Sequence, residues 1–274
     1  MIKIIGFDLD DTLLGSNKDI PDLESVKKAI NKGIKIAFCS GRPFSKKTKE
    51  YYQELGINEG YFCGYNGTAI FDIKTEECIY ENSLDTNELF FIMDVVNKAF
   101  NKIKDDIDIS DVSICYHHDG IVYTNRINKF IELEAVLNKT KAIVKDNLID
   151  DNTIANKFMI DGEPEVISAL LPYVKAPLEE RFNVMVSMPC FIEVIKKDAS
   201  KYSGLKTIAD IYGISENEIM AFGDSMNDYE LVKDAYLGIA MGNSVQRIKE
   251  VSKYVTDTND NHGIKKALEK FGVI

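Results

Sequence analysis

Two acidic residues follow the first apolar stretch of the chain. Residues 2–7 are mostly apolar and are typical of a buried strand, and Asp8 and Asp10 come directly after them. In an open α/β sheet, ligands bind beyond the carboxyl ends of the strands. One carboxylate there can attack a phosphorus atom while its neighbour moves a proton, and both can help to hold a cation. An Asp-rich turn is the alternative interpretation.

A second acidic loop lies far along the chain and favours the chemical interpretation. The apolar residues 219–222 are followed by Gly223, Asp224, Asn227 and Asp228. Two acids with an amide between them supply the oxygen ligands that a hard cation such as Mg²⁺ prefers. A helix cap would need only one Asp, so this loop indicates a metal site more strongly than a cap.

Two weaker signals lie at predicted helix starts. Ser40, Gly41 and Arg42 follow the strand predicted at 34–39, and they place a hydroxyl and backbone N–H groups where a phosphate oxygen can bind. An ordinary N-cap by Ser40 is the alternative. Lys201 lies where the positive end of a helix dipole disfavours a cation, unless an anion is near. Because other lysines lie close by in the sequence, this signal does not decide which of them belongs to the site.

Composition narrows the class of protein. The 274 residues are enough for one large domain or two ordinary ones, and 45% hydrophobic residues allow a sizeable core. The formal net charge of −11 disfavours nucleic acid and anionic membranes as partners. No apolar run approaches ~20 residues and no secretory signal is visible, so we expect a cytoplasmic protein without a membrane span.

The cysteines and histidines indicate neither a disulfide framework nor a zinc site. The five cysteines are an odd number, and none forms a CxxC pair. The three histidines lack metal-ligand spacing to one another or to a cysteine. Reduced, buried thiols are expected.

The order of the predicted elements at both ends of the chain indicates an α/β core. The predicted strands of this core are residues 2–7, 34–39, 61–63, 69–71, 219–222 and 236–240, and its predicted helices are 21–31, 43–56, 202–212 and 264–271. Strands that alternate with helices predict a doubly wound, mainly parallel sheet.

The middle of the chain shows a different pattern. A long amphipathic helix at 86–104 is followed by strands that come in pairs with short connections. These strands are predicted at 112–116, 120–124, 157–160, 184–188 and 191–195, with helices at 129–137 and from residue 164. Such pairs predict an antiparallel sheet with helices on one face. We therefore expect an α+β domain at 82–188, inserted into a discontinuous core of residues 1–81 and 189–274.

Taken together, the motifs resemble those of the haloacid dehalogenase superfamily, specifically its Cof-type phosphatases (subfamily IIB). The resemblance rests on residues 8–12, 40–42, 66–67, 201, 223–228 and 240–243, which occur in the family's order. It covers nearly the whole chain, and it implies a Rossmann-like core with an inserted cap of the C2B type.

The resemblance implies a role for each acidic residue. Asp8 is expected to be the nucleophile that forms an aspartyl-phosphate, and Asp10 the general acid and then the general base. The implied Mg²⁺ ligands are Asp8, Asp224 and, through its backbone carbonyl, Asp10. The groups implied to hold the phosphoryl oxygens are Ser40, Gly41, Lys201 and Asn227. The implied supporting residues are Thr12, Arg42, Asn66 and Asp228.

The function implied is Mg²⁺-dependent hydrolysis of small phosphorylated metabolites, such as sugar phosphates. A phosphomutase of the same superfamily is an alternative, and a phospho-accepting signalling module is a more distant one, because receiver modules are half this length. The cap is expected to choose the substrate. His117 and Arg181 are the cap residues that we select first, on polarity and position, from a set that also includes Tyr116, His118 and Met185.

Overall fold

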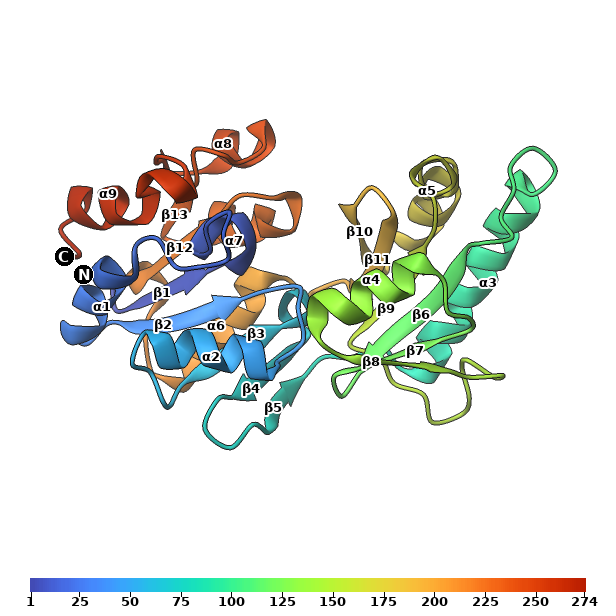
Figure 1. The fold of residues 1–274 in the computed structure, drawn as a ribbon, viewed down its shortest axis with the longest axis horizontal. Helices are drawn as coiled ribbons and strands as arrows, with labels where there is room; N and C mark the ends of the chain where they lie inside the picture. Colours follow the sequence, from blue (N-terminus) through green and yellow to red (C-terminus); the bar gives the residue numbers. More distant parts are fainter. The chain divides into compact units, whose positions relative to one another are not determined.

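The computed structural model describes residues 1–274, except for the side chain of Leu137. The chain divides into two compact units (Figure 1). The core unit consists of Met1–Tyr80 and Ser200–Ile274, and the inserted unit of Glu81–Ala199. The two ends of the chain lie side by side on the core unit.

The core unit contains an eight-stranded sheet in the order β14-β13-β12-β1-β2-β3-β4-β5. Its strands are β1 (Ile4–Phe7), β2 (Lys35–Cys39), β3 (Tyr61–Gly64), β4 (Ala69–Asp72), β5 (Cys78–Glu81), β12 (Ile219–Gly223), β13 (Leu237–Ala240) and β14 (Tyr254–Val255). The pairs from β14 to β3 are parallel, and β4 is antiparallel to β3. The predicted doubly wound, mainly parallel sheet is thus confirmed, while β5 and β14 lie outside the predicted strands.

Helices cover both faces of this sheet because successive strand residues point to opposite sides. The helices of the core unit are α1 (Leu23–Asn31), α2 (Lys46–Glu54), α6 (Lys201–Ile211), α7 (Tyr229–Asp234), α8 (Gln246–Val251) and α9 (Gly263–Lys270). Ile5 packs with residues of α1, α2 and α9, whereas its neighbour Ile4 packs with residues of α6 and α7. Strands buried on both faces read as continuous apolar runs, which explains residues 2–7.

The core helices begin one to three residues away from the predicted starts, and a serine cap explains two of these differences. The helix predicted from Pro43 begins at Lys46, because Ser45 caps it by accepting a hydrogen bond from the backbone N–H of Thr48. The helix predicted from Tyr202 begins at Lys201, and Ser200 caps it in the same way. The second cap places Lys201 in the first helical turn.

The inserted unit contains a six-stranded sheet in the order β10-β11-β9-β6-β7-β8. Its elements are α3 (Thr86–Ile103), β6 (Ser113–His118), β7 (Ile121–Thr124), α4 (Lys129–Asn138), β8 (Lys141–Val144), β9 (Lys157–Asp161), α5 (Pro164–Leu178), β10 (Phe182–Met188) and β11 (Phe191–Lys196). The sheet is antiparallel as predicted, except that the unpredicted strand β8 runs parallel to β7.

The prediction that helices cover one face of this sheet is wrong. Ile114 of β6 belongs to an apolar cluster with α3 and α5, while the next residue, Cys115, packs with Phe130 and Ile131 of α4. Alternate residues of β6 therefore face different helices, and the sheet is buried on both sides.

The predicted return to the core near Pro189 is also displaced. Pro189 lies in the tight turn between β10 and β11, and β11 pairs with both β10 and β9 of the inserted unit. The second crossing therefore comes after Ala199, and the first comes between Tyr80 and Glu81. An apolar strand that follows a proline does not by itself reveal which sheet it joins.

Among the residues that the structure describes, no helix combines the length and the apolar character needed to cross a bilayer.

Candidate active site

Three loops meet at one edge of the core sheet. Asp8 follows β1, Ser40 follows β2 and Asp224 follows β12. Phe7, the last residue of β1, is in register with Phe38 and Phe222 on its two parallel neighbours. Strands that are parallel and in register end at the same edge, so the three polar residues lie beyond the carboxyl ends of the sheet.

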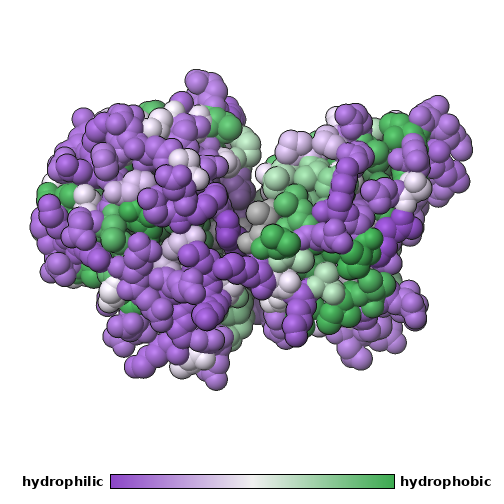
Figure 2. Space-filling model, viewed as in Figure 1, coloured by the Kyte–Doolittle hydropathy of each residue, from purple (hydrophilic) through white to green (hydrophobic). Residues whose placement is uncertain are grey.

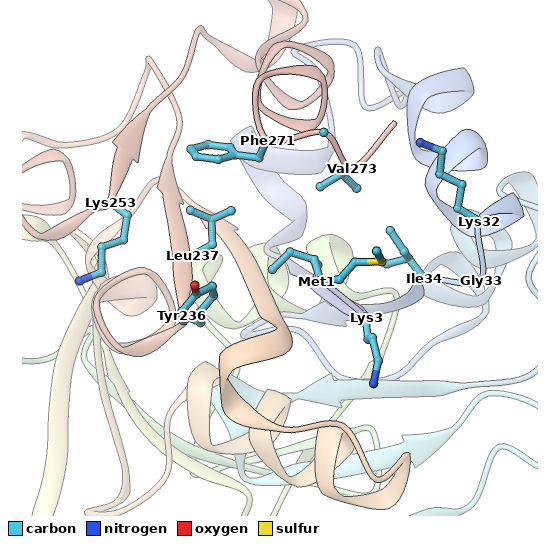
Figure 3. Close-up of a pocket in the computed structure, with 12 residues that line it drawn as sticks. Met1, Lys3, Lys32, Gly33, Ile34, Tyr236, Leu237, Lys253, Phe271 and Val273 are labelled. Atoms are coloured by element: carbon cyan, nitrogen blue, oxygen red, sulfur yellow. The ribbon is translucent and has the colours of Figure 1, made fainter.

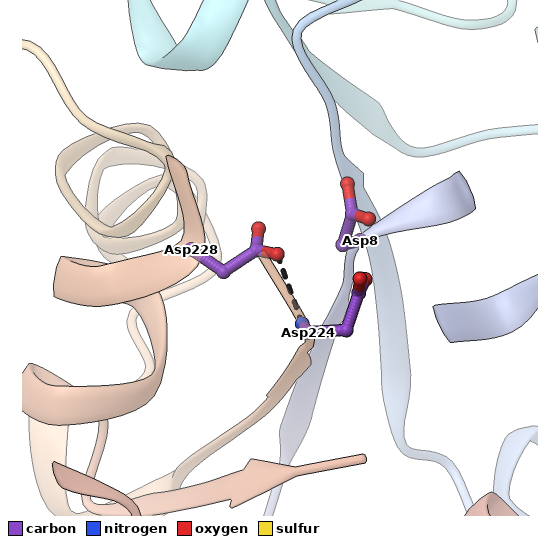
Figure 4. A group of neighbouring side chains, drawn as sticks. All are labelled: Asp8, Asp224 and Asp228. Atoms are coloured by element: carbon purple, nitrogen blue, oxygen red, sulfur yellow. Dashed lines mark hydrogen bonds between the residues drawn. The ribbon is translucent and has the colours of Figure 1, made fainter. Parts of the chain in front are cut away.

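A buried group of carboxylates forms at this edge. Asp8, Asp224 and Asp228 each place a carboxylate oxygen within 4.8 Å of the others, and all three are buried. Figure 4 shows the three side chains close together, with an oxygen of Asp228 directed to the backbone nitrogen of Asp224. One oxygen of Asp228 accepts hydrogen bonds of 3.0 Å from the backbone N–H groups of Asp224 and Ser225. Asp228 thereby fixes the turn that carries Asp224.

Lys201 provides the positive charge within this group. Its Nζ atom lies 2.6 Å from Oδ1 of Asp8 and 2.6 Å from Oδ1 of Asp228, and its side chain is 1% exposed. Burial acts to lower the pKa of Lys201, but the two carboxylates raise it, so the ammonium group stays charged. The carboxylates of Asp8 and Asp228 are thus the anions that offset the unfavourable position of Lys201 at the start of a helix.

Helix α6 reaches this position because a glycine lets it approach. Gly67 has φ +99°, and a Cβ atom there would lie 1.9 Å from the carbonyl oxygen of Ser200. Ser200 is the N-cap of α6, so a side chain at residue 67 would push away the helical turn that carries Lys201. There is therefore a steric reason for a glycine at residue 67, which belongs to one of the family-like motifs, and the sequence alone did not reveal it.

The buried group formed by Asp8, Asp224, Asp228 and Lys201 has more negative than positive charges. Three carboxylates and one ammonium group leave an excess of two negative charges. Burial, and then the nearby Asp228 carboxylate, raise the pKa of Asp8, although Lys201 acts to lower it. The same two causes raise the pKa of Asp224 to about 6. A divalent cation between these oxygens would balance the charge, and the donors are the oxygen ligands that hard cations take.

Hydroxyl groups hold Asp224 in place. Thr12 donates a hydrogen bond of 2.8 Å to its Oδ1, and Ser225 donates one of 2.7 Å to its Oδ2. Thr12 is fully buried and belongs to the loop that carries Asp8. Its hydroxyl therefore ties the loop after β1 to the loop after β12.

The side chain of Asp10 lies outside the carboxylate group, which leaves its backbone carbonyl as the predicted metal ligand. Arg42 binds it with two hydrogen bonds of 2.7 Å, and Nζ of Lys18 lies 3.1 Å from the same carboxylate. Burial acts to raise the pKa of Asp10, but Arg42 and then Lys18 lower it overall. The backbone turns here, since Asp10 is extended and the next residue has φ 56°.

Three of the predicted phosphate-binding residues, Ser40, Gly41 and Asn227, lie beside Asn66, whereas Lys201 binds Asp8 and Asp228. Oγ of Ser40 accepts a hydrogen bond of 3.2 Å from the backbone N–H of Arg42. The backbone carbonyl of Ser40 accepts one of 2.9 Å from the backbone N–H of Asn66. The side chain of Asn227 donates to that of Asn66 over 3.2 Å. A Cβ atom at Gly41 would lie 3.1 Å from the side chain of Asn66, so a glycine there leaves Asn66 room.

Three residues that sequence reasoning did not place in the site contribute to it. Lys18 contacts Asp10, Ser225 contacts Asp224, and Asn243 donates a hydrogen bond of 2.7 Å to the backbone carbonyl of Asp11. The motif at 240–243 carried a signal for Asn243, whereas Lys18 lies in a loop with no characteristic spacing. Such partners become visible only when the loops are placed in space.

The first-choice residues of the inserted unit lie in packed surroundings. His117 is 1% exposed and lies 3.3 Å from Glu134, and burial, aided by Lys157, lowers its pKa. The guanidinium group of Arg181 lies over the rings of Phe91 and Phe182. Both residues therefore have structural contacts within the inserted unit, and their influence on substrate choice stays a prediction.

Comparison with known proteins identifies the family. A family model described as haloacid dehalogenase-like hydrolase matches residues 5–268. The chain belongs to this family. It is 28% identical to the putative phosphatase YxeH of Bacillus subtilis over 278 residues, with 98% of each chain covered. It is 26% identical to the B. subtilis 5-amino-6-(5-phospho-D-ribitylamino)uracil phosphatase YitU, with 98% of this chain and 97% of the relative covered.

Solved structures agree with this assignment. A haloacid dehalogenase-like hydrolase from Bacteroides thetaiotaomicron has a TM-score of 0.80 at 27% identity, with 99% of this chain and 100% of that chain covered. The phosphatase BT1666 from the same organism has a TM-score of 0.76 at 25% identity, with 100% and 96% covered. The protein is thus an enzyme of the Cof-type phosphatase branch of the superfamily, as the motifs predicted.

Proposed function

We propose that this phosphatase is Mg²⁺-dependent and hydrolyses small phosphomonoesters, such as sugar phosphates, through an aspartyl-phosphate on Asp8. The observation that carries the proposal is the buried group of Asp8, Asp224 and Asp228 around Lys201 at the carboxyl edge of the sheet. The family assignment supports the reaction class, and the phosphorylated metabolite named for a relative supports the substrate class.

The residues present fit a divalent cation. The ligands that we propose are carboxylate oxygens of Asp8 and Asp224 and the backbone carbonyl of Asp10. Asp228 is better suited to position Lys201, because its two oxygens already accept hydrogen bonds from Lys201 and from two backbone N–H groups. When bound, the cation would offset negative charge on the phosphoryl group as it meets the Asp8 carboxylate.

The first half of the reaction joins Asp8 to the phosphoryl group. An Asp8 oxygen attacks the phosphorus atom, the ester P–O bond breaks, and the leaving oxygen takes a proton from Asp10. In the second half, Asp10 takes a proton from a water molecule. The water oxygen attacks the phosphorus atom, and the bond to Asp8 breaks to release inorganic phosphate. Each proton and each bond is thereby accounted for with two carboxyl groups of this chain.

The contact between Asp10 and Arg42 bears on these two halves. Arg42 and Lys18 favour the carboxylate form of Asp10, which suits the proton acceptor of the second half. The first half needs Asp10 protonated, so the carboxyl group has to separate from Arg42 before it serves the leaving oxygen. Arg42 is thus proposed as the group that positions Asp10.

The remaining site residues hold the phosphoryl oxygens. Three separate segments supply donors: the hydroxyl of Ser40 and the backbone N–H of Gly41, the ammonium of Lys201, and the amide of Asn227. Such donors stabilise the charge of a transferring phosphoryl group. The inserted unit is proposed to act as the cap that selects the leaving group, as the family resemblance implies.

The test measures phosphate release from a panel of phosphorylated metabolites, with and without MgCl₂ after removal of metal by a chelator. We expect turnover only with Mg²⁺, and we expect Asp8→Asn to abolish both turnover and the acid-stable labelling of the protein by a ³²P-labelled substrate. Asp11→Asn is the matched control, because Asp11 is exposed and its neutralisation changes the charge by the same amount. Near-normal turnover of Asp8→Asn would contradict the proposal, and transfer of phosphate to a second hydroxyl without release would indicate a mutase.

A further inference from the structure

A second pocket lies in the core unit, far from the carboxylate group. It has a volume of about 940 Å³, within the range of small-molecule sites. Four separate segments line it: residues 1–3 before β1, residues 32–34 before β2, residues 236–237 at the start of β13, and residues 271–273 after α9, together with Lys253. Three of these segments lie at the amino-terminal ends of β1, β2 and β13, and β12 lies between β13 and β1 in the sheet.

This pocket lies at the opposite edge of the sheet from the proposed active site. Lys3 precedes β1 and Asp8 follows it, so the two sites are separated by the length of that strand. At about 3.3 Å per residue, this separation is about 16 Å. A molecule in the pocket therefore does not compete sterically with a phosphate group at Asp8.

The lining combines an apolar floor with cationic edges. Figure 3 shows the side chains of Met1, Leu237, Phe271 and Val273 around a shared space. The charged side chains that line the pocket are lysines, and they stand at the margin of the apolar group in Figure 3. Within the described part of the chain, no acidic residue lines the pocket. These features suit a molecule with an apolar body and an anionic group.

The charge on the lysines is only partly neutralised. Lys3 forms an ion pair of 2.7 Å with Glu218. Among the residues that the structure describes, Lys32 and Lys253 have no ion-pair partner within 4.0 Å. A local excess of positive charge is notable in a chain of net charge −11. It provides electrostatic complementarity for an anion beside an apolar surface.

We propose that this pocket binds an anionic amphiphile, namely a short acyl chain or aromatic ring that carries one acidic group. The apolar body lies against Leu237, Phe271 and Val273, and the acidic group lies at the margin of the pocket beside Lys32 or beside Lys253, which stand on opposite sides of the apolar group in Figure 3. Neither the carboxylate group around Asp8 nor the proposed phosphatase reaction is needed for this binding.

The test uses a series of probes with one body and different head groups. Octanoate, octanesulfonate, 1-octanol and octylammonium are titrated into the full-length protein by calorimetry. We expect the two anions to bind at least about tenfold more tightly than the alcohol at low salt, and octylammonium to bind most weakly, since the charges differ by one or two units. The advantage of the anions over the alcohol should shrink as salt is added.

Variants locate the site. The double variant Lys32→Glu/Lys253→Glu should weaken octanoate at least about tenfold and leave 1-octanol unchanged, which also shows that the pocket is still formed. Lys28→Glu is the matched control, because Lys28 is an exposed lysine on α1 that does not line the pocket. Backbone amide signals of Gly33 and Gly272 should shift with octanoate in the wild type and not in the double variant.

Three results would overturn the proposal. One is equal binding of octanoate and 1-octanol, and another is equal binding of octanoate to the double variant and to Lys28→Glu. The third is a dimer, seen by light scattering, that dissociates in the double variant, because a second copy of the chain would then be the occupant.

Discussion

Replacement of Lys201 by Met provides a sharp test of the buried charge group. Lys201 is 1% exposed and lies 2.6 Å from each of two buried carboxylates, so the variant leaves both without their cation. Removal of one partner of a buried ion pair costs about 3–5 kcal/mol. Loss of a cation from the first turn of α6 returns about 0.3–1 kcal/mol, because the helix dipole disfavours it there. We therefore expect the free energy of unfolding to fall by about 2–4 kcal/mol.

Lys206→Met is the matched control, with the same substitution in the same helix. The side chain of Lys206 is 44% exposed and forms a surface ion pair with Glu216, so its loss should change stability little. Unfolding in urea is followed by circular dichroism in the presence of a chelator, because the chain contains no Trp to serve as a fluorescent probe. The expected loss is smaller than the total stability of an ordinary domain, so the variant should still fold.

Activity separates the structural effect from the catalytic one. With Mg²⁺ present and the variant folded, Lys201→Met should lower kcat by about 10²–10³-fold, the effect of removing one preorganised donor at a developing charge. If both lysine variants lost equal stability, the description of Lys201 as a buried bridge would be wrong. If stability fell while turnover stayed normal, its proposed contact with the phosphoryl group would be wrong.

Three further predictions concern proton transfer by Asp10, the affinity for Mg²⁺, and the pH dependence of stability that Asp161 causes in the inserted unit. Asp10→Asn should lower kcat by about 10²–10⁴-fold for alkyl phosphates and less for p-nitrophenyl phosphate, so equal losses would contradict its role in proton transfer. Thr12→Val removes the hydroxyl that holds Asp224 and should raise the Mg²⁺ concentration for half-maximal activity by about 10–100-fold, measured by a metal titration. Burial raises the pKa of Asp161 to about 6, so the folded protein keeps this proton above the pKa of the unfolded chain, and stability falls as pH rises from about 4 to 6. Asp161→Asn should flatten that fall in urea midpoints measured at pH 4.5 and 7, and an unchanged slope would show that other groups cause it.

A separate prediction is that the inserted unit selects the substrate. Substitution of His117 or Arg181 should change the relative kcat/KM values among substrates while the aspartyl-phosphate still forms. Because His117 is buried and Arg181 packs on two rings, each variant needs an unfolding measurement beside the substrate panel. An unchanged ranking of substrates in stable variants would show that other residues of the unit read the leaving group.

The sequence by itself determined which loops meet at one end of the core sheet. An apolar run followed by Asp8, another followed by Ser40 and a third followed by Asp224 are local patterns, and the alternation of strands with helices makes those strands parallel. Parallel strands in register end at one edge, so the meeting of the three loops follows from local patterns and topology alone. The glycine at residue 67 and the lysine at residue 201 were visible as motif positions, but not the contacts that give them meaning.

Only the tertiary structure decided which side chains face one another within those loops. Asp8 and Lys201 are 193 residues apart, and Thr12 and Asp224 are 212 apart, so no local pattern encodes either contact. The turn of the backbone at Asp10 moves its carboxylate to Arg42, and Asp228 joins Asp8 and Asp224 in the buried acidic group. The boundary at Ala199 likewise depends on which sheet accepts β11, since strand pairing is a choice between distant partners. Hydrogen bonds and direct ion pairs need their atoms within about 3–4 Å, so their partners are fixed only when packing brings distant segments together.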